Sequence, residues 1–245
     1  MRENVISVTS ERVIYDGQLG KLQRHSHATL ALLVGVERPF SLGTAAGISS
    51  CSVAIVPAGV EHELDFFGAR AIVVYVEPHD AGYASFHRAA AGSCPTLAEL
   101  AQPWASALDE WSERQDCRPL LARATDAFRA SPATLDRRIR ELAARFNRGE
   151  LLDADMQELA ARVGLSTSRL VHLIKAELGV GVRRLKQHYR FKMVARATAA
   201  GQNLTAAAHA AGFADSGHFS RTFLVTFGLS PSKILLRDAG TDFLT

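Results

Sequence analysis

The sequence predicts a two-domain α+β protein, with a small β-rich N-terminal domain followed by an all-α C-terminal domain. Three observations support this prediction. Short apolar runs broken by Gly and Pro fill residues 1–80, helical periodicity begins after Pro78, and one helical motif occurs twice after Asp153. The length of 245 residues is ample for two domains. We expect a barrel at 1–80, a helical linker or dimerisation segment at 81–150, and a helical domain at 151–245.

The first domain is predicted from its strands. β-branched and apolar residues recur in short runs, and Gly or Pro separates them at short intervals. Many short strands with frequent turns are typical of a small barrel or sandwich. The runs are Val5–Val8, Thr29–Val34, Ser52–Val56 and Ala71–Val76.

Helical periodicity dominates the segment that follows. We expect helices at Pro103–Arg114, Pro119–Arg129 and Pro132–Phe146, the last opened by a Ser131 cap with Pro at the first helical position. The third helix carries an apolar stripe at helical spacing. This stripe packs either on the rest of the chain or on a second subunit, and it consists of Leu135, Ile139, Leu142 and Phe146.

Composition indicates a soluble cytoplasmic protein. Apolar residues make up 47% and charged residues 22% of the chain, as in ordinary globular proteins. The three cysteines, Cys51, Cys94 and Cys117, form no CxxC pair and no disulfide framework. The sequence has neither a signal-peptide pattern nor an apolar run long enough to cross a bilayer, so we expect no membrane partner.

Charge is unevenly distributed along the chain. Residues 160–245 hold 12 Lys and Arg against 4 Asp and Glu, a balance of +8, whereas the whole chain carries only +3. Such an asymmetry suggests that the C-terminal part meets a polyanion. By itself it fits a basic solvated surface equally well.

The repeated motif gives the basic region a more specific meaning. Gly164 of the first copy corresponds to Gly212, 48 residues on. The apolar positions and the final glycine of each copy are 49 residues apart, so the copies differ by one residue in the turn. These corresponding positions are Leu170 with Phe219, Ile174 with Phe223, and Gly179 with Gly228.

Each copy has the pattern of a helix-turn-helix unit. A short Ala-rich helix allows close approach of a second helix, a Gly permits a left-handed turn, and a polar residue caps the second helix. The exposed face of that second helix is the one that enters the DNA major groove. We expect Asp155 and Thr205 to cap the short helices, and Ser166 and Asp215 to cap the reading helices.

Residues Asp153 to Leu235 closely resemble the AraC/XylS family of transcription regulators. The resemblance includes the Gly-Leu-Ser-x-Ser-x-Leu block from Gly164, the Gly-Phe-Ala-Asp-Ser-Gly-His-Phe segment from Gly212, and a terminal Phe-Gly-Leu-Ser-Pro-Ser. It implies a long helix from about Val182 to Ala200 that joins the two units. It also implies that the domain contacts two successive major-groove segments. Ile174 stands where the family usually has Phe.

The resemblance also implies which side chains face the groove. Arg169 and Arg221 are suited to bidentate contacts with guanine. Five basic residues of the long helix contact either phosphates or the helix's own surroundings: Arg183, Arg184, Lys186, Lys192 and Arg196. The groove-facing set is Ser168, Arg169, Val171, His172 and Lys175 in the first unit, and Ser216, Gly217, His218 and Arg221 in the second.

Three histidines of the N-terminal domain resemble the two motifs of cupin barrels. His25 and His27 form an HxH pair, and His62 ends a PxGxxH segment, so the three imidazoles should converge inside the barrel. The Glu that usually follows the HxH pair is absent, since Ala31 and Leu32 occupy its place. The histidines therefore bind a divalent metal, line a polar effector pocket, or only stabilise the barrel.

The sequence thus predicts a non-enzymatic, sequence-specific DNA-binding transcription regulator, controlled by a small-molecule or metal effector in the N-terminal cupin-like barrel. Its cofactor is unknown, with a divalent metal at the histidines as the candidate. The expected partners are double-stranded DNA, the effector and RNA polymerase, and the expected state is monomer or homodimer. One alternative is a metal-dependent cupin enzyme with a helical accessory domain. Another is a DNA-binding protein without an effector, whose barrel serves only for dimerisation.

Overall fold

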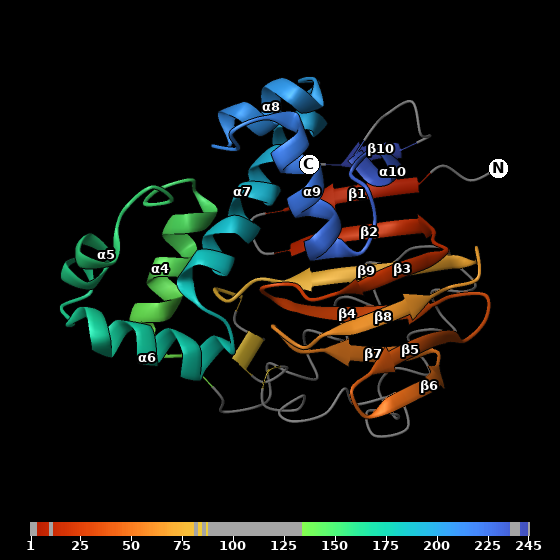
Figure 1. Ribbon diagram of the computed structural model, residues 1–245, viewed down its shortest axis with the longest axis horizontal. Helices are drawn as coiled ribbons and strands as arrows, with labels where there is room; N and C mark the ends of the chain where they lie inside the picture. The colour runs from red at the N-terminus through yellow and green to blue at the C-terminus, as the bar shows by residue number, and fades with distance from the viewer. Residues whose placement is uncertain are drawn as a thin grey trace.

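A β domain and a helical domain pack side by side in the computed structural model (Figure 1). The structure describes residues 4–9, 12–80, 83–84, 87, 134–235 and 241–244. Two sheets form the β domain, and the helices follow it in sequence. The predicted fold class is therefore confirmed. The helices expected at 103–114 and 119–129 lie outside the described residues.

The larger sheet has six strands in the order β10-β1-β2-β9-β4-β7. Its strand β4, which lies between β9 and β7, is buried over its whole length, because both faces of the sheet are covered there. The runs expected as strands form β1, β4, β7 and β9, as predicted. The strands are β1 (Asn4–Val8), β2 (Arg12–Gln18), β4 (Leu30–Gly35), β7 (Val53–Val56), β9 (Arg70–Val76) and β10 (Thr241–Leu244).

The smaller sheet has four strands in the order β3-β8-β5-β6, all antiparallel. Its strand β3 pairs with β8 in a register that places His25 opposite His62. This pairing brings the two histidine motifs together. The strands are β3 (Lys21–His25), β5 (Phe40–Thr44), β6 (Gly47–Cys51) and β8 (His62–Asp65).

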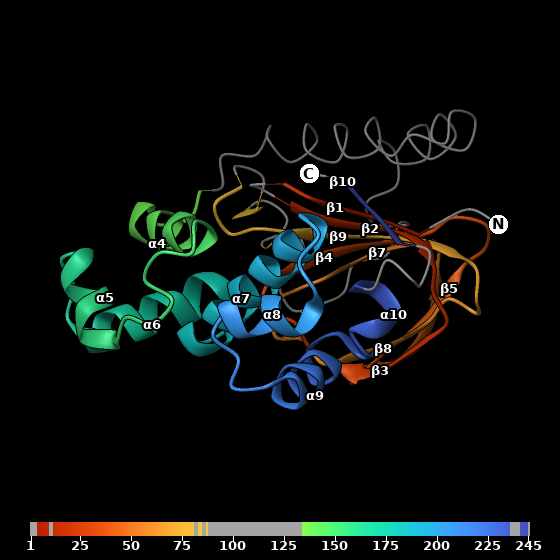
Figure 2. The same ribbon diagram turned by 90° about the horizontal axis from the view of Figure 1, so that it is seen from above.

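The strand β10 comes from the opposite end of the chain. It pairs in parallel with β1, with Asn4 opposite Thr241 and Ser7 opposite Leu244. Every other pairing in the sheet is antiparallel. The C-terminal end of the helical domain is therefore part of the sheet of the β domain (Figures 1 and 2).

Seven helices are described in the C-terminal domain. The helix α4 begins at Arg137 with Asp136 as its cap, so the prediction of a start at Pro132 was wrong. The Asp136 side chain accepts a hydrogen bond from the Arg138 N–H, which satisfies a free donor of the first turn. The helices are α4 (Arg137–Asn147), α5 (Met156–Arg162), α6 (Thr167–Leu178), α7 (Val182–Ala199), α8 (Leu204–Ala210), α9 (Ser216–Phe227) and α10 (Ser232–Leu235).

The apolar stripe of α4 packs within the chain. Ile139, Leu142 and Phe146 are almost fully buried, and Leu135 packs partly against the same core. The ring of Phe146 lies 5.9 Å from that of Tyr189 in α7, centroid to centroid. Of the two arrangements that the sequence left open, the structure therefore shows the intramolecular one.

The long helix α7 belongs to two cores at once. Leu185 and Tyr189 join the core formed by α4, α5, α6 and one face of the larger sheet. Phe191 and Val194 join the core formed by α8, α9, α10 and the other face. A helix that buries residues nearly all round its axis cannot move without disturbing both cores.

The ends of α6 and α9 both rest on the β domain. Each helix ends at a glycine in the left-handed region, Gly179 with φ 71° and Gly228 with φ 74°. The Gly228 carbonyl accepts a hydrogen bond from the Gln23 N–H in β3, at 2.9 Å. A Cβ on Gly179 would lie 3.1 Å from the Ala58 carbonyl oxygen, so this turn also lies against the β domain.

Within the described part of the chain, no helix has the length and apolar character needed to span a membrane.

Replacing Gly228 by Ala should separate α9 from β3. The new Cβ would lie 2.6 Å from the Gln23 carbonyl oxygen and 2.7 Å from His25 Nδ1, and the positive φ adds about 1–2 kcal/mol of strain. The matched control is Gly164→Ala, where φ is 65° and nothing lies within 4 Å of the new Cβ. We expect a larger loss of unfolding free energy in urea for Gly228→Ala than for Gly164→Ala. Equal losses would contradict the docking role.

Candidate nucleic-acid interface

The first helix-turn-helix unit comprises α5 and α6. Asp155 caps α5 by accepting hydrogen bonds from the Gln157 and Glu158 N–H groups, each at 2.8 Å. Gly164 has φ 65°, the left-handed conformation that the turn requires. Ser166 then caps α6, as predicted.

All five predicted reading positions of α6 are exposed. Arg169, His172 and Lys175 lie on the outer face of the helix, and Val171 is 50% exposed although it is apolar. The opposite face of α6 is buried through Leu170, Ile174 and Leu178. The helix therefore presents one outer face on which the full predicted set lies: Ser168, Arg169, Val171, His172 and Lys175.

The second unit comprises α8 and α9. Asn203, not Thr205, caps α8, and its side chain accepts from the Ala206 N–H at 2.8 Å. The helix starts two positions earlier than we expected, and both residue types are good caps. Asp215 caps α9 as predicted, accepting from the His218 N–H at 2.6 Å.

Packed aromatic rings position α9. Phe191 of α7 lies within 6.0 Å, centroid to centroid, of the rings of Phe213, Phe219, Phe223 and Phe227. This cluster buries one face of α9 and leaves the other to solvent. Ser216, His218 and Arg221 are exposed and Gly217 is half-buried.

The Arg221 side chain lies back over the first turn of α9. A Cβ on Gly217 would lie 3.1 Å from Arg221 Nη1, so the missing side chain at Gly217 leaves room for the guanidinium. The hydrogen bond from the His218 N–H and the nearby Arg221 charge lower the pKa of Asp215. Arg221 is thus oriented at the helix end that enters the groove in helix-turn-helix proteins.

The basic residues of α7 are mostly engaged inside the protein. Arg184 donates to the Ser26 carbonyl at 2.7 Å, and Lys186 donates to the Ala154 carbonyl. Arg196 donates to the Asn147 carbonyl at 2.7 Å, and Arg183 is exposed. The sequence left open whether these residues contact phosphates or the helix's own surroundings. Four of the five contact the surroundings of the helix, namely Arg184, Lys186, Arg196 and Lys192, and the contact of Lys192 is described next.

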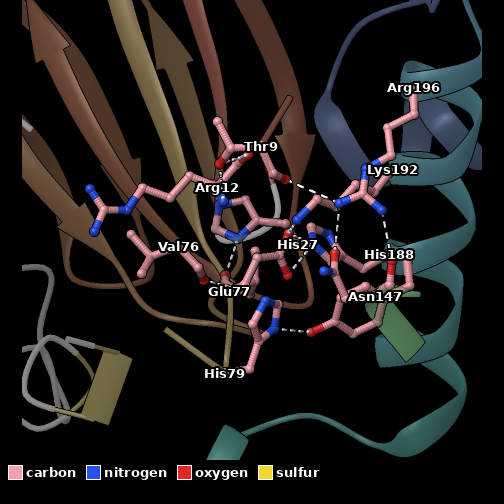
Figure 3. Close-up of polar contacts among 12 residues, drawn as sticks. Thr9, Arg12, His27, Val76, Glu77, His79, Asn147, His188, Lys192 and Arg196 are labelled. Atoms are coloured by element: carbon pink, nitrogen blue, oxygen red, sulfur yellow. Dashed lines mark hydrogen bonds and ion pairs between the residues drawn. The ribbon is translucent and has the colours of Figure 1, made fainter. Parts of the chain in front are cut away.

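A buried ion cluster joins α7 to the β domain. Glu77, which directly follows β9, is fully buried. Its carboxylate lies 3.0 Å from Lys192 Nζ and 3.1 Å from His188 Nε2 (Figure 3). Burial alone would raise the pKa of Glu77, but the charges of its two partners outweigh burial and lower the pKa to about 2. Glu77 is therefore ionised and compensated.

The sequence did not single out Glu77 or His188 as functional residues. Glu77 and His188 are 111 residues apart in the chain, so no local pattern connects them. The only hint is a carboxylate placed directly after the apolar run Ala71–Val76. A buried acid with two basic partners can be recognised only in the folded chain.

An apolar cavity of about 80 Å³ lies beside this cluster. Its walls come from both domains, with Tyr15 and Tyr75 from the large sheet and Phe223 and Phe227 from α9. His188 and Lys192 are the basic residues in the wall. The cavity is smaller than typical ligand pockets of about 300–1,000 Å³, so a ligand of ordinary size has to separate the walls.

The three predicted histidines do converge. The ring centroids of His25 and His62 are 4.2 Å apart, and those of His27 and His62 are 5.0 Å apart. Burial lowers the pKa of all three, that of His62 to about 4, so the rings are neutral near neutral pH. Each Nδ1 then donates to a backbone carbonyl, those of Gln23, Thr29 and Val60.

The second ring nitrogens of His27 and His62, their Nε2 atoms, are buried and have no hydrogen-bond partner among the described residues. Among the described residues, no group of three or more His, Cys, Asp or Glu is placed to hold a metal ion. The cavity described above is also not lined by His25, His27 or His62. What the geometry does show is a structural role, because these histidines hold the segments on which α6 and α9 end. The Gly59 N–H, for example, donates to the His27 carbonyl at 2.9 Å.

Comparison with known proteins agrees with the helical repeat. Residues 159–237 match the family model described as a helix-turn-helix domain, and no curated protein matches the sequence. The resemblance to AraC/XylS regulators inferred from the sequence is thereby confirmed for this domain.

Solved structures of ToxT from Vibrio cholerae share the fold of the whole chain. A ligand-free ToxT variant has a TM-score of 0.62 at 12% identity, over 94% of this chain and 98% of the other. ToxT with a bound unsaturated fatty acid has a TM-score of 0.55 at 13% identity, over 96% and 97%. ToxT with a methylnaphthalenyl-butenoic acid has a TM-score of 0.59 at 11% identity, over 92% and 98%.

Removing the charge of Glu77 should destabilise the protein strongly. Glu77→Gln leaves two buried basic residues without their carboxylate, and breaking a buried ion pair in this way costs about 3–5 kcal/mol. Urea unfolding at neutral pH measures the loss. The control Glu150→Gln removes a carboxylate that is 44% exposed, and it should change stability little.

The contribution of ionised Glu77 to the free energy of unfolding should vanish in acid. The folded-state pKa of about 2 lies below the ordinary value of 4.5, so the stabilisation is complete above 4.5 and is lost as the pH falls toward 2. The stability difference between wild type and Glu77→Gln should therefore narrow over that range. A difference that stays constant into acid would contradict an ionised, compensated Glu77.

Proposed function

We propose that this chain, whose residues 159–237 form an AraC-type helix-turn-helix domain, is a transcription regulator that reads a specific DNA sequence with α6 and α9. We further propose that its DNA binding responds to an apolar carboxylic acid held between the two domains. The observation that carries the proposal is the paired arrangement of α6 and α9. Each buries one face, exposes the predicted reading residues on the other, and ends on the β domain.

In this proposal the two units read bases differently. Arg221 and Arg169 make bidentate contacts with guanine, and His172 and His218 donate to a base or a phosphate. Val171 offers apolar contact, for instance with a thymine methyl group. A hollow of about 350 Å³ between the units is lined by Arg183, Lys186, Arg190 and His218, among others, which suits a phosphate backbone between the two grooves.

The effector class is inferred from the cavity. Its walls are almost entirely apolar, with His188 and Lys192 as the basic residues in the lining. ToxT structures contain an unsaturated fatty acid in one case and a methylnaphthalenyl-butenoic acid in another. Both ligands combine an apolar body with one carboxyl group, and this combination matches the cavity. Because both domains contribute walls, a ligand there changes how α7 and α9 contact the sheet.

Arg221→Ala should weaken binding to the cognate site and relax specificity at one base pair. Losing one bidentate contact costs about 1–3 kcal/mol. Electrophoretic mobility shifts on the selected site and on single-base variants measure the effect. The control Arg148→Ala removes an equally charged, exposed residue outside both units. A uniform loss on all sequences would identify Arg221 as a phosphate contact instead.

An apolar acid should change the affinity for DNA. Adding decanoic acid to the protein–DNA complex should shift the midpoint of the mobility titration, whereas 1-decanol should shift it less. Ala195→Leu, which adds carbon atoms at the cavity wall, should abolish the response and retain DNA binding. Ala161→Leu on the exposed face of α5 is the matched control. If no binding or response occurs with the acid, the effector proposal is wrong and the DNA-reading proposal stands.

A further inference from the structure

Three residues at the start of α9 lie together, namely Asp215, Gly217 and Arg221. A Cβ on Gly217 would lie 3.1 Å from Asp215 Oδ1 and 3.1 Å from Arg221 Nη1. The two atoms are therefore no further apart than twice that distance, and the charges of the two side chains attract each other. Both side chains approach the space that a side chain at position 217 would occupy.

The missing side chain at Gly217 determines where Arg221 can lie. Side chains of an α-helix point toward its N-terminus and cover the preceding turn, and Arg221 follows Gly217 by four residues. A side chain at position 217 would compete with the guanidinium for this space. Glycine within a helix is destabilising relative to alanine, and at this position it leaves the first turn open to Arg221.

Asp215 is held in place by its role as the cap of α9. Its Oδ1 atom accepts a hydrogen bond from the His218 N–H at 2.6 Å. This hydrogen bond and the charge of Arg221 hold the pKa of Asp215 below its usual range, so the carboxylate is ionised at neutral pH. Asp215 and Arg221 are both exposed, so their attraction is weak in water, and it becomes stronger when bound DNA excludes water.

The first helix-turn-helix unit has different residues at the three corresponding positions. These positions, 49 residues earlier, hold Ser166, Ser168 and His172. Ser166 caps α6 with a neutral hydroxyl. Of the two reading helices, α9 is therefore the one that combines a charged cap with an arginine lying over a glycine.

Near DNA, an exposed arginine can bond to a phosphate or to the base edge of guanine. A phosphate contact adds affinity without sequence information, whereas a bidentate contact with guanine O6 and N7 discriminates between bases. In helix-turn-helix proteins the N-terminal residues of the second helix contact the base edges. A carboxylate at this end of α9 attracts the guanidinium and repels phosphates, so it favours the contact with guanine.

We propose that Asp215 is the positioning residue that holds Arg221 for contact with guanine and thereby sets the base specificity of α9. This inference rests on the proposed DNA-reading function. Asp215 acts through Arg221, and its charge works against non-specific contact with the phosphate backbone. Removing that charge should therefore lower the specificity without lowering the affinity for unrelated DNA.

Asp215→Asn tests the inference, because asparagine is as good a cap as aspartate and carries no charge. Mobility shifts of the full-length protein compare the selected site with variants at the base pair that Arg221→Ala identifies. We expect the preference for guanine there to fall about fivefold or more, the lower end of what one bidentate contact contributes. Gly217→Ala should also lower this preference, since the added Cβ displaces the guanidinium. The control Asp136→Asn, at the cap of α4 beside Arg138, should leave it unchanged.

A double-mutant cycle separates positioning from direct contact with a base. In the Arg221→Ala protein, adding Asp215→Asn should cause no further loss of base preference. A loss that persists without Arg221 would mean that Asp215 reads a base itself, and it would overturn the inference. An unchanged preference in a folded Asp215→Asn protein would also overturn it and leave the DNA-reading proposal intact. If the wild-type protein selects no DNA sequence, both are overturned.

Discussion

The structure depends on the contact between Glu77 and the long helix α7. A fully buried carboxylate is stable in a protein interior only when basic groups compensate it, and here both partners come from one helix. The compensation fixes where α7 lies against β9 and how it is rotated about its axis. Since α7 contributes to the cores of both helix-turn-helix units, this one contact also sets the position of both reading helices relative to the sheet.

The histidine segments act as the second set of constraints on the reading helices. The turn after α6 lies against Ala58 and Gly59, and the turn after α9 lies against Gln23 and His25. Arg184 ties the start of α7 to Ser26, between the two histidines of the HxH pair. The imidazole–carbonyl hydrogen bonds give these segments a defined shape. The two histidine motifs thus form part of the surface on which the helix-turn-helix units rest.

The sequence predicted the local features of the molecule well. Caps such as Asp155 and Asp215, and the left-handed glycines Gly179 and Gly228, are determined by neighbouring residues, so their patterns are readable in a single chain. The convergence of His25, His27 and His62 was also predicted, because HxH and PxGxxH are strong motifs. What these rings bind stays a prediction, since the Nδ1 hydrogen bonds to backbone carbonyls engage only one nitrogen of each ring.

Long-range features could not be predicted in the same way. The strand β10 adds to β1 across almost the whole length of the chain, and the basic residues of α7 find internal carbonyls that no local pattern specifies. The misplaced starts of α4 and α8 are different errors. In each case the sequence offers two residues of good capping type, Ser131 and Asp136 or Asn203 and Thr205, and the cap in the structure is Asp136 or Asn203.

The internal contacts of α7 change the meaning of the basic C-terminal region. Of the positive charge in residues 160–245, an appreciable share is engaged inside the protein. Arg184, Lys192 and Arg196 bond to the β domain and form a docking set, whereas Lys186 and Arg190 bond within the helical domain. The other exposed basic residues described in this segment are Arg169, Lys175 and Arg221 on α6 and α9, the reading set, and Arg162, Arg183 and Lys233 on other helices. The docking set and the reading set are therefore different residues of one basic segment. A ligand that separates the cavity walls acts on the docking set, and it reaches the reading set only by moving α7 and α9. Linkage then requires that DNA shift the affinity for the ligand by the same factor as the ligand shifts the affinity for DNA.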